Sequence, residues 1–168
     1  YMDRQIHRWT KQYKDSETQM IPEINELIEW LPKNIPSDQE TTIVHGDFRL
    51  DNMIFDPITH EVKAILDWEL STLGNPIADF TYHMMSWRLP AGAKGLGMMG
   101  SDLKSLNIPS ENEYAELYYK KTGREKIDNW DFYMAYNIFR LAGIAQGIVG
   151  RVRDGTASSS EAKNYEAF

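Results

Sequence analysis

The spacing of apolar residues changes twice along the chain, and this change restricts the fold more than any other feature of the sequence. Towards both ends, apolar residues recur every three or four positions, which is typical of amphipathic helices. Between positions 41 and 66, short β-branched and apolar runs replace that pattern and indicate strands. We therefore expect an α+β fold that is mainly helical and has a small β-hairpin insertion.

The periodicity also places each expected element. Helices are predicted over residues 2–14, 22–31, 77–87, 111–121 and 130–149, and strands over residues 41–44, 53–55 and 62–66. The second helix is expected to stop at Pro32 and Pro36, because proline lacks the backbone N–H that a helix needs. The chain has 168 residues, 42% of them hydrophobic, so residues 1–168 suffice for a single domain with a buried core.

Composition excludes several classes of function. Lys and Arg number 18 and Asp and Glu number 25, so the net charge of −7 repels nucleic acid and anionic membrane surfaces. The chain has no cysteine, which excludes disulfides, thiolate zinc sites and a cysteine nucleophile. No apolar run approaches the ~20 residues of a membrane span. We therefore expect a cytoplasmic protein whose partners include neither nucleic acid nor a membrane.

The densest group of polar side chains lies between the first two predicted strands, at positions 45–52. Loops that join strands commonly display reactive groups. In the register expected for the hairpin that follows, Asn52 lies opposite Asp67, close to the loop that contains Asp47. Oxygen donors of this kind suit Mg²⁺, which takes one or two protein carboxylates and completes its shell with water and phosphate oxygens. The sequence therefore predicts a magnesium site and phosphate chemistry.

An ordinary structural interpretation of the same residues stays open. Asp, Asn and Gly are common turn formers, so Asp47, Asn52 and Asp67 could each serve only to shape a turn. Asp67, however, ends an apolar strand, where burial of its carboxylate would be costly without a cation or hydrogen bonds. A bound metal ion would supply that compensation.

The spacing of these residues resembles a known enzyme family. The matching features are His-Gly-Asp at positions 45–47, an Asn five residues after Asp47, and Asp-Trp-Glu at positions 67–69 after a hairpin. They are similar to the catalytic loop and metal-binding segment of the aminoglycoside phosphotransferase and choline kinase family, relatives of the protein kinases. The resemblance implies the C-terminal lobe of a kinase-like fold, with Mg²⁺ and with ATP as co-substrate.

The resemblance also assigns chemical roles to four positions. Asp47 is the implied catalytic base, which accepts the proton of the substrate hydroxyl. Arg49 would stabilise charge on the transferring phosphoryl group. Asn52 and Asp67 would hold the Mg²⁺ ions that bridge the phosphates of ATP. The implied reaction moves the γ-phosphoryl group of ATP to a hydroxyl of a small molecule.

His45 and Asp79 match family positions that support the catalytic loop. Histidine is the side chain most often used as a general base, but the family pattern makes His45 structural. Asp79 would also suit the first turn of a helix, where the helix dipole favours a negative charge. We therefore expect both residues to position the loop.

The resemblance covers residues 21–149, which match the larger lobe of such an enzyme. The residues that precede position 41 contain neither a glycine-rich strand hairpin nor the Val-Ala-x-Lys strand that orders the phosphates of ATP. We expect the chain to be a fragment that needs an N-terminal lobe in cis. By itself it should be inactive.

The acceptor is less clearly encoded. The segment 44–80 is similar to the subgroup associated with acyl-CoA dehydrogenases, which implies a hydroxyacyl-CoA or hydroxy acid acceptor. A choline-type site would need an aromatic cage, but the helical spacing of the aromatic residues favours core packing. An aminoglycoside site would need acidic groups, whereas Arg140, Arg151 and Arg153 would suit an anionic acceptor. A non-catalytic scaffold lobe remains the alternative outside enzymes.

Overall fold

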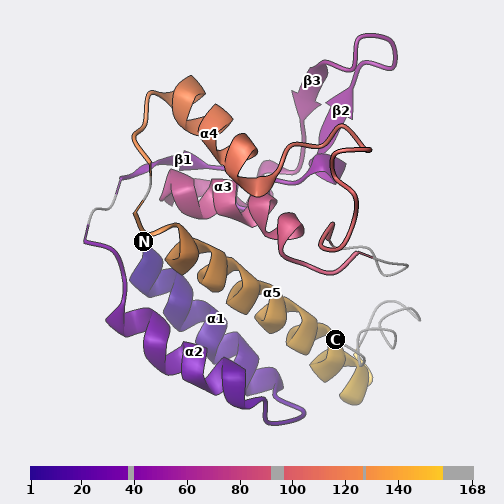
Figure 1. The fold of residues 1–168 in the computed structure, drawn as a ribbon. Helices are drawn as coiled ribbons and strands as arrows, with labels where there is room; N and C mark the ends of the chain where they lie inside the picture. The colour runs from indigo at the N-terminus through magenta and orange to yellow at the C-terminus, as the bar shows by residue number, and fades with distance from the viewer. Residues whose placement is uncertain (38–39, 92–96, 127, 157–168) are drawn as a thin grey trace. The chain divides into compact units, whose positions relative to one another are not determined.

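The computed structural model describes residues 1–37, 40–91, 97–126 and 128–156. Over these residues the fold is mainly helical α+β, with small antiparallel sheets (Figure 1). In chain order the helices and strands are α1 (Met2–Ser16), α2 (Pro22–Lys33), β1 (Thr42–Val44), β2 (Met53–Phe55), β3 (Val62–Ile65), β4 (Thr72–Gly74), α3 (Pro76–Met84), α4 (Glu111–Thr122) and α5 (Trp130–Arg153). Short 3₁₀ turns lie at Leu50–Asn52, Trp68–Leu70 and Met85–Trp87.

The predicted helices are present, with small differences at their ends. The first and last helices extend further than predicted, to Ser16 and Arg153. The prediction that Pro32 stops the second helix is wrong, because Pro32 lies inside α2 and the helix ends at Lys33. Near a C-terminal end a proline removes a hydrogen bond, but little helix remains to be disrupted. The Asn34 N–H closes the end by donating to the carbonyl of Leu31.

Contacts group the chain into two compact units, residues 1–40 with 135–168, and residues 41–134. The first unit consists of α1, α2 and most of α5, which Figure 1 shows as three neighbouring helices. α1 buries one face, formed by Met2, Ile6, Trp9 and Tyr13. The Gln146 amide of α5 donates to the Ser16 carbonyl and to the Thr18 hydroxyl, each at 2.8 Å. Within the described residues, no helix is long and apolar enough to cross a membrane.

The second unit holds both sheets, each a pair of antiparallel strands. β1 pairs with β4, with Thr42 opposite Gly74 and Val44 opposite Thr72. β4 was not predicted, because its three residues include only one β-branched side chain and end in glycine, which strands disfavour. The pairing matters for the site because it brings the start of α3 next to the end of β1.

The predicted register of the β2–β3 hairpin is wrong by one residue at Met53 and Ile54 and by two at Phe55, because the pairing is irregular between Ile54 and Phe55. Met53 lies opposite Ile65, and the Leu66 N–H donates to the Asn52 carbonyl at 2.8 Å, so Asn52 faces Leu66 and not Asp67. The turn sets this register. His60 adopts a left-handed conformation there, with φ of 58°. The sequence pattern alone did not show that conformation.

α3 begins at a buried cap. The Asn75 side-chain oxygen accepts hydrogen bonds from the N–H groups of Ile77 and Ala78, at 2.9 and 3.2 Å. Its amide donates to the Tyr133 hydroxyl at 3.2 Å, and Asn75 is only 2% exposed. One side chain therefore fixes the start of α3 and links it to the first turns of α5.

Replacing Asn75 by alanine should lower the free energy of unfolding by about 2–3 kcal/mol, because a cap is lost and the Tyr133 hydroxyl loses a buried partner. The exposed cap of α4, Ser110, provides the matched control: Ser110→Ala should cost about 1 kcal/mol. Urea titration of both variants measures the difference. Equal losses would contradict the importance of the buried cap.

Candidate functional site

A single carboxylate of α3 holds the polar loop that follows β1. Asp79 Oδ2 accepts a hydrogen bond from the His45 backbone N–H at 2.7 Å, and Oδ1 accepts one from the Gly46 N–H at 2.9 Å. Asp79 lies in the first turn of α3. Both oxygen atoms of one side chain therefore fix the first two peptide groups of the loop to the helix.

The ring of His45 is buried and both of its nitrogens are engaged. The Asp47 N–H donates to Nδ1 at 3.2 Å, so Nδ1 is unprotonated. Nε2 therefore holds the ring hydrogen and donates it to the Leu66 carbonyl at 2.8 Å. The imidazole thus links the loop to the end of β3, and neither nitrogen is available to act as a base.

Gly46 is required by the backbone at this point. Its φ is 86°, a conformation that residues with a side chain rarely adopt. A Cβ atom added here would lie 2.5 Å from the carbonyl oxygen of Leu70. Glycine therefore permits both the sharp turn and the close approach of the 3₁₀ turn that follows Asp67.

Asp47 and Asn52 are brought into direct contact. The Asn52 amide Nδ2 donates to the Asp47 carbonyl at 2.9 Å and to its carboxylate Oδ2 at 3.1 Å. Arg49 Nε lies 3.4 Å from Asp47 Oδ1, and its terminal Nη2 lies 2.9 Å from Asp51 Oδ2. The Asp47 side chain is 18% exposed, so a small molecule can reach this carboxylate.

Asp67 is placed at the end of the same hairpin, but not as predicted. The residue is exposed, so the argument that burial of its carboxylate calls for a cation is wrong. Its backbone is left-handed, with φ of 63°, and it caps the 3₁₀ turn at Trp68–Leu70. Among the described residues, none donates a hydrogen bond to its carboxylate. Asp67 follows Leu66, which bonds to both Asn52 and His45.

The donor set fits a magnesium ion that is shared with a substrate. Asn52 donates both of its side-chain hydrogen bonds through Nδ2. Among the described residues, no group donates a hydrogen bond to its Oδ1 or to the Asp67 carboxylate, so these oxygens are available to a metal ion. In the part of the chain that the structure describes, no group of three or more His, Asp or Glu residues could enclose a metal. Mg²⁺ commonly takes only one or two protein carboxylates and fills its shell with water and phosphate oxygens.

The profile of the phosphotransferase enzyme family matches residues 1–117 of this sequence. The chain belongs to this family. A Ralstonia eutropha protein of known crystal structure, assigned as an aminoglycoside phosphotransferase, is 52% identical and superposes with a TM-score of 0.92 over 99% of this chain. The match covers 51% of that protein.

Two curated relatives are long proteins named for a different activity. Acyl-CoA dehydrogenase family member 10 of Mus musculus is 49% identical over 97% of this chain, and family member 11 of Homo sapiens is 41% identical over 96%. The chain spans 15% and 21% of their respective lengths. It is therefore similar to one phosphotransferase-like part of each relative.

One further residue of α3 reaches the loop and was missed by the sequence analysis. The ring centroid of His83 lies 5.8 Å from that of Phe48, the residue after Asp47. His83 follows Asp79 by four positions, so both lie on one face of α3. That spacing is the sequence signal that could have found it.

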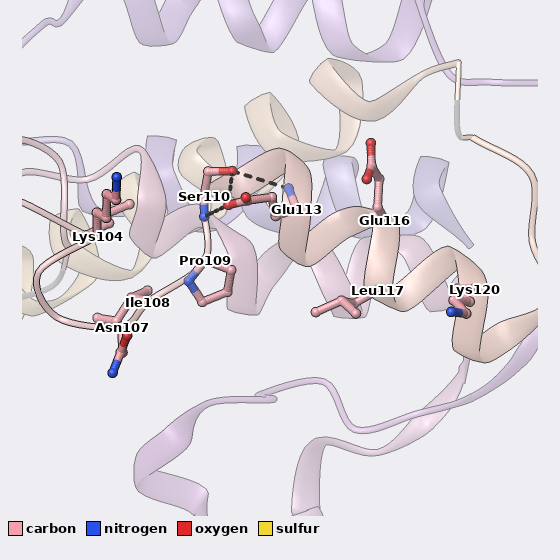
Figure 2. Close-up of a pocket in the computed structure, with 10 residues that line it drawn as sticks. Lys104, Asn107, Ile108, Pro109, Ser110, Glu113, Glu116, Leu117 and Lys120 are labelled. Carbon is pink, nitrogen blue, oxygen red and sulfur yellow. Dashed lines mark hydrogen bonds between the residues drawn. The ribbon is translucent and has the colours of Figure 1, made fainter.

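Two hollows in the second unit lie on residues other than the predicted site residues. Figure 2 shows the larger, a groove of about 1050 Å³ beside α4, in which Ser110 and Glu113 bind each other as a helix cap. The smaller, of about 600 Å³, contains Arg88, whose guanidinium lies 2.7 Å from Glu111 and 2.8 Å from Asp131. These polar groups are already paired, so the loop remains the candidate site.

Replacing Gly46 by alanine should destabilise the protein by about 2–4 kcal/mol, because the new methyl group meets the Leu70 carbonyl and φ is unfavourable. Gly123 tests the two causes separately, since its φ is 66° but nothing lies within 4 Å of an added Cβ. Gly123→Ala should cost only about 1 kcal/mol. Chemical denaturation that gives the same loss for both variants would refute the close approach at Gly46.

Proposed function

We propose that this chain is the larger lobe of an ATP- and Mg²⁺-dependent phosphotransferase whose acceptor is a small-molecule hydroxyl. The observation that supports it most is the contact between Asn52 and Asp47. One face of the Asn52 amide binds the Asp47 carboxylate, and the other presents an oxygen without a donor among the described residues. The proposed metal ligand Asn52 is thus in direct contact with the proposed base Asp47, the two groups that phosphoryl transfer needs close together.

Asp47 acts on the acceptor. The acceptor hydroxyl oxygen attacks the γ-phosphorus of ATP, the bond from that phosphorus to the oxygen it shares with the β-phosphate breaks, and ADP leaves. Asp47 takes the proton of the hydroxyl. The Asn52 amide at Oδ2 keeps the carboxylate oriented, and its partial exposure leaves it open to the acceptor.

Asn52 and Asp67 hold the magnesium ion through their side-chain oxygens. A Mg²⁺ ion held there would supply positive charge that neutralises the phosphates of ATP. The Leu66–Asn52 hydrogen bond keeps these two positions at one end of the hairpin. Asp67 adds one negative charge, which strengthens the hold on a divalent cation.

Arg49 supplies positive charge beside the base. Its side chain is 42% exposed, and its terminal Nη2 pairs with the exposed Asp51, an ion pair that costs little energy to break. A guanidinium can bind two oxygens of that group at once. This is the role proposed for Arg49 in stabilising the transferring charge.

For the acceptor we propose a hydroxyacyl-CoA or a related hydroxy acid. The support is the names of the relatives, which are acyl-CoA dehydrogenase family members. Among the aromatic residues that a choline cage could use, Tyr82, Tyr133 and Tyr136 are each less than 5% exposed and pack in the interior. Arg153, considered for an anionic acceptor, is paired with Asp154 at 2.8 Å.

The two carboxylates should give different phenotypes in the full-length, two-lobed protein. Asp47→Asn removes the base, so kcat should fall about 10²- to 10⁴-fold with little change in the KM for ATP. Asp67→Asn removes a charge from the metal site, so the KM for MgATP should rise and added Mg²⁺ should partly restore the rate. Steady-state kinetics over a magnesium series measure both effects.

Glu61 provides a matched control at the far end of the same hairpin, where its side chain is 70% exposed. Glu61→Gln should leave kcat and both KM values unchanged. If the Asp47 and Asp67 variants also turn over MgATP like the parent, these residues are turn formers and the proposed function fails.

A further inference from the structure

A continuous row of aromatic rings passes the catalytic loop. Starting beside Asp67, its members are Trp68, His45, Phe48, His83, Tyr114 and Trp87. Successive ring centroids lie between 4.7 and 6.0 Å apart. We call this set the aromatic row. It joins the 3₁₀ turn after Asp67, the loop, α3 and α4.

Two members of the aromatic row directly follow proposed site residues in the sequence. Asp67 precedes Trp68 at one end, and Asp47 precedes Phe48 near the middle. In phosphoryl transfer the attacking and leaving oxygens lie roughly in line with the phosphorus. The attacking hydroxyl at Asp47 would therefore lie on the opposite side of the phosphorus from the leaving oxygen. Beyond Phe48, on the side of the row away from Trp68, the next member is His83.

α3 fixes the position of His83 relative to the loop. Asp79 of this helix binds the loop backbone, and His83 lies four residues further along the same face. Its ring meets Phe48 in an edge-on arrangement, with an interplanar angle of 68°. A single rigid element thus sets both the loop and the imidazole beside it.

His83 has unused hydrogen-bonding capacity. Both nitrogens of His45 are engaged, and the indole N–H groups of Trp68 and Trp87 donate to the carbonyls of Ile65 and Pro109 at 2.8 and 2.9 Å. The His83 ring nitrogens, in contrast, have no partner among the described residues. They are therefore available to a ligand or to water. Burial lowers the pKa of His83, so at neutral pH its ring is uncharged, with one donor and one acceptor.

We infer that His83 is a specificity residue that donates a hydrogen bond to a carbonyl oxygen of an acyl acceptor, while Asp47 faces the hydroxyl of the same molecule. The inference rests on the proposed function and assigns one contact within it. It adds a second point of recognition, which orients the acceptor chain as well as its reacting oxygen.

The surroundings of His83 are aromatic and apolar. The rings that contact it belong to Phe48, Trp87 and Tyr114. Trp87 and Tyr114 also stack on each other at 5.1 Å. An uncharged imidazole among aromatic rings suits a carbonyl group attached to an apolar chain.

The test measures ADP release by the full-length, two-lobed protein with a set of hydroxyacyl-CoA thioesters that differ in hydroxyl position, and with choline and kanamycin. His83→Phe keeps an aromatic ring but removes both nitrogens. It should raise the KM for the best thioester about tenfold, with kcat and the KM for ATP within about twofold of the parent. His83→Gln retains an N–H donor and should lose less. His7→Phe, at an exposed position of α1, should change nothing.

Results that contradict the role of His83 differ from results that contradict the proposed function. An unchanged thioester KM in His83→Phe, or a uniform loss in kcat and in the KM values of both substrates, would overturn the role of His83 alone. Preferred turnover of choline or kanamycin would overturn the acyl acceptor and the inference with it. If the parent protein releases no more ADP with any of these compounds than without them, the proposed function fails as well.

Discussion

The two hydrogen bonds from the backbone of His45 and Gly46 to the Asp79 carboxylate are the interaction on which the candidate site depends. They tie the start of the loop to a helix whose own start is fixed by the buried Asn75 cap. A carboxylate that accepts two N–H groups holds a loop more firmly than a turn made by the chain alone. The position of Asp47 follows, because its peptide group is next in the chain and bonds to the His45 ring.

From this anchor the geometry extends in two directions. Toward the hairpin, His45 donates to the Leu66 carbonyl, and the Leu66 N–H donates to the Asn52 carbonyl, so hydrogen bonds connect the loop to the end of the hairpin. Toward α4, Phe48 meets His83, one turn along the helix from Asp79. The same helix therefore organises the side of the loop that faces the proposed metal and the side that faces the proposed acceptor.

The sequence predicted the helices and the polar loop because both have strong local patterns, a repeat of three to four residues and a run of hydrogen-bonding side chains. It did not predict the hairpin register, which depends on a left-handed His60 in the turn. It placed Asp67 opposite Asn52 and gave it a buried carboxylate, whereas the residue is exposed and one position away. It missed His83 because an isolated histidine gains meaning only from a neighbour distant in sequence, here Phe48.

In the proposed function, Asn52 and Asp67 hold the same divalent cation beside a base at Asp47. A crystal structure of the two-lobed protein with Mn²⁺ and a non-hydrolysable ATP analogue tests this arrangement, because anomalous scattering locates the ion. We expect an ion at about 2.0–2.3 Å from Asn52 Oδ1 and from an oxygen of Asp67, with analogue phosphates completing its shell. A bound analogue whose Mn²⁺ touches neither side chain would contradict the claim.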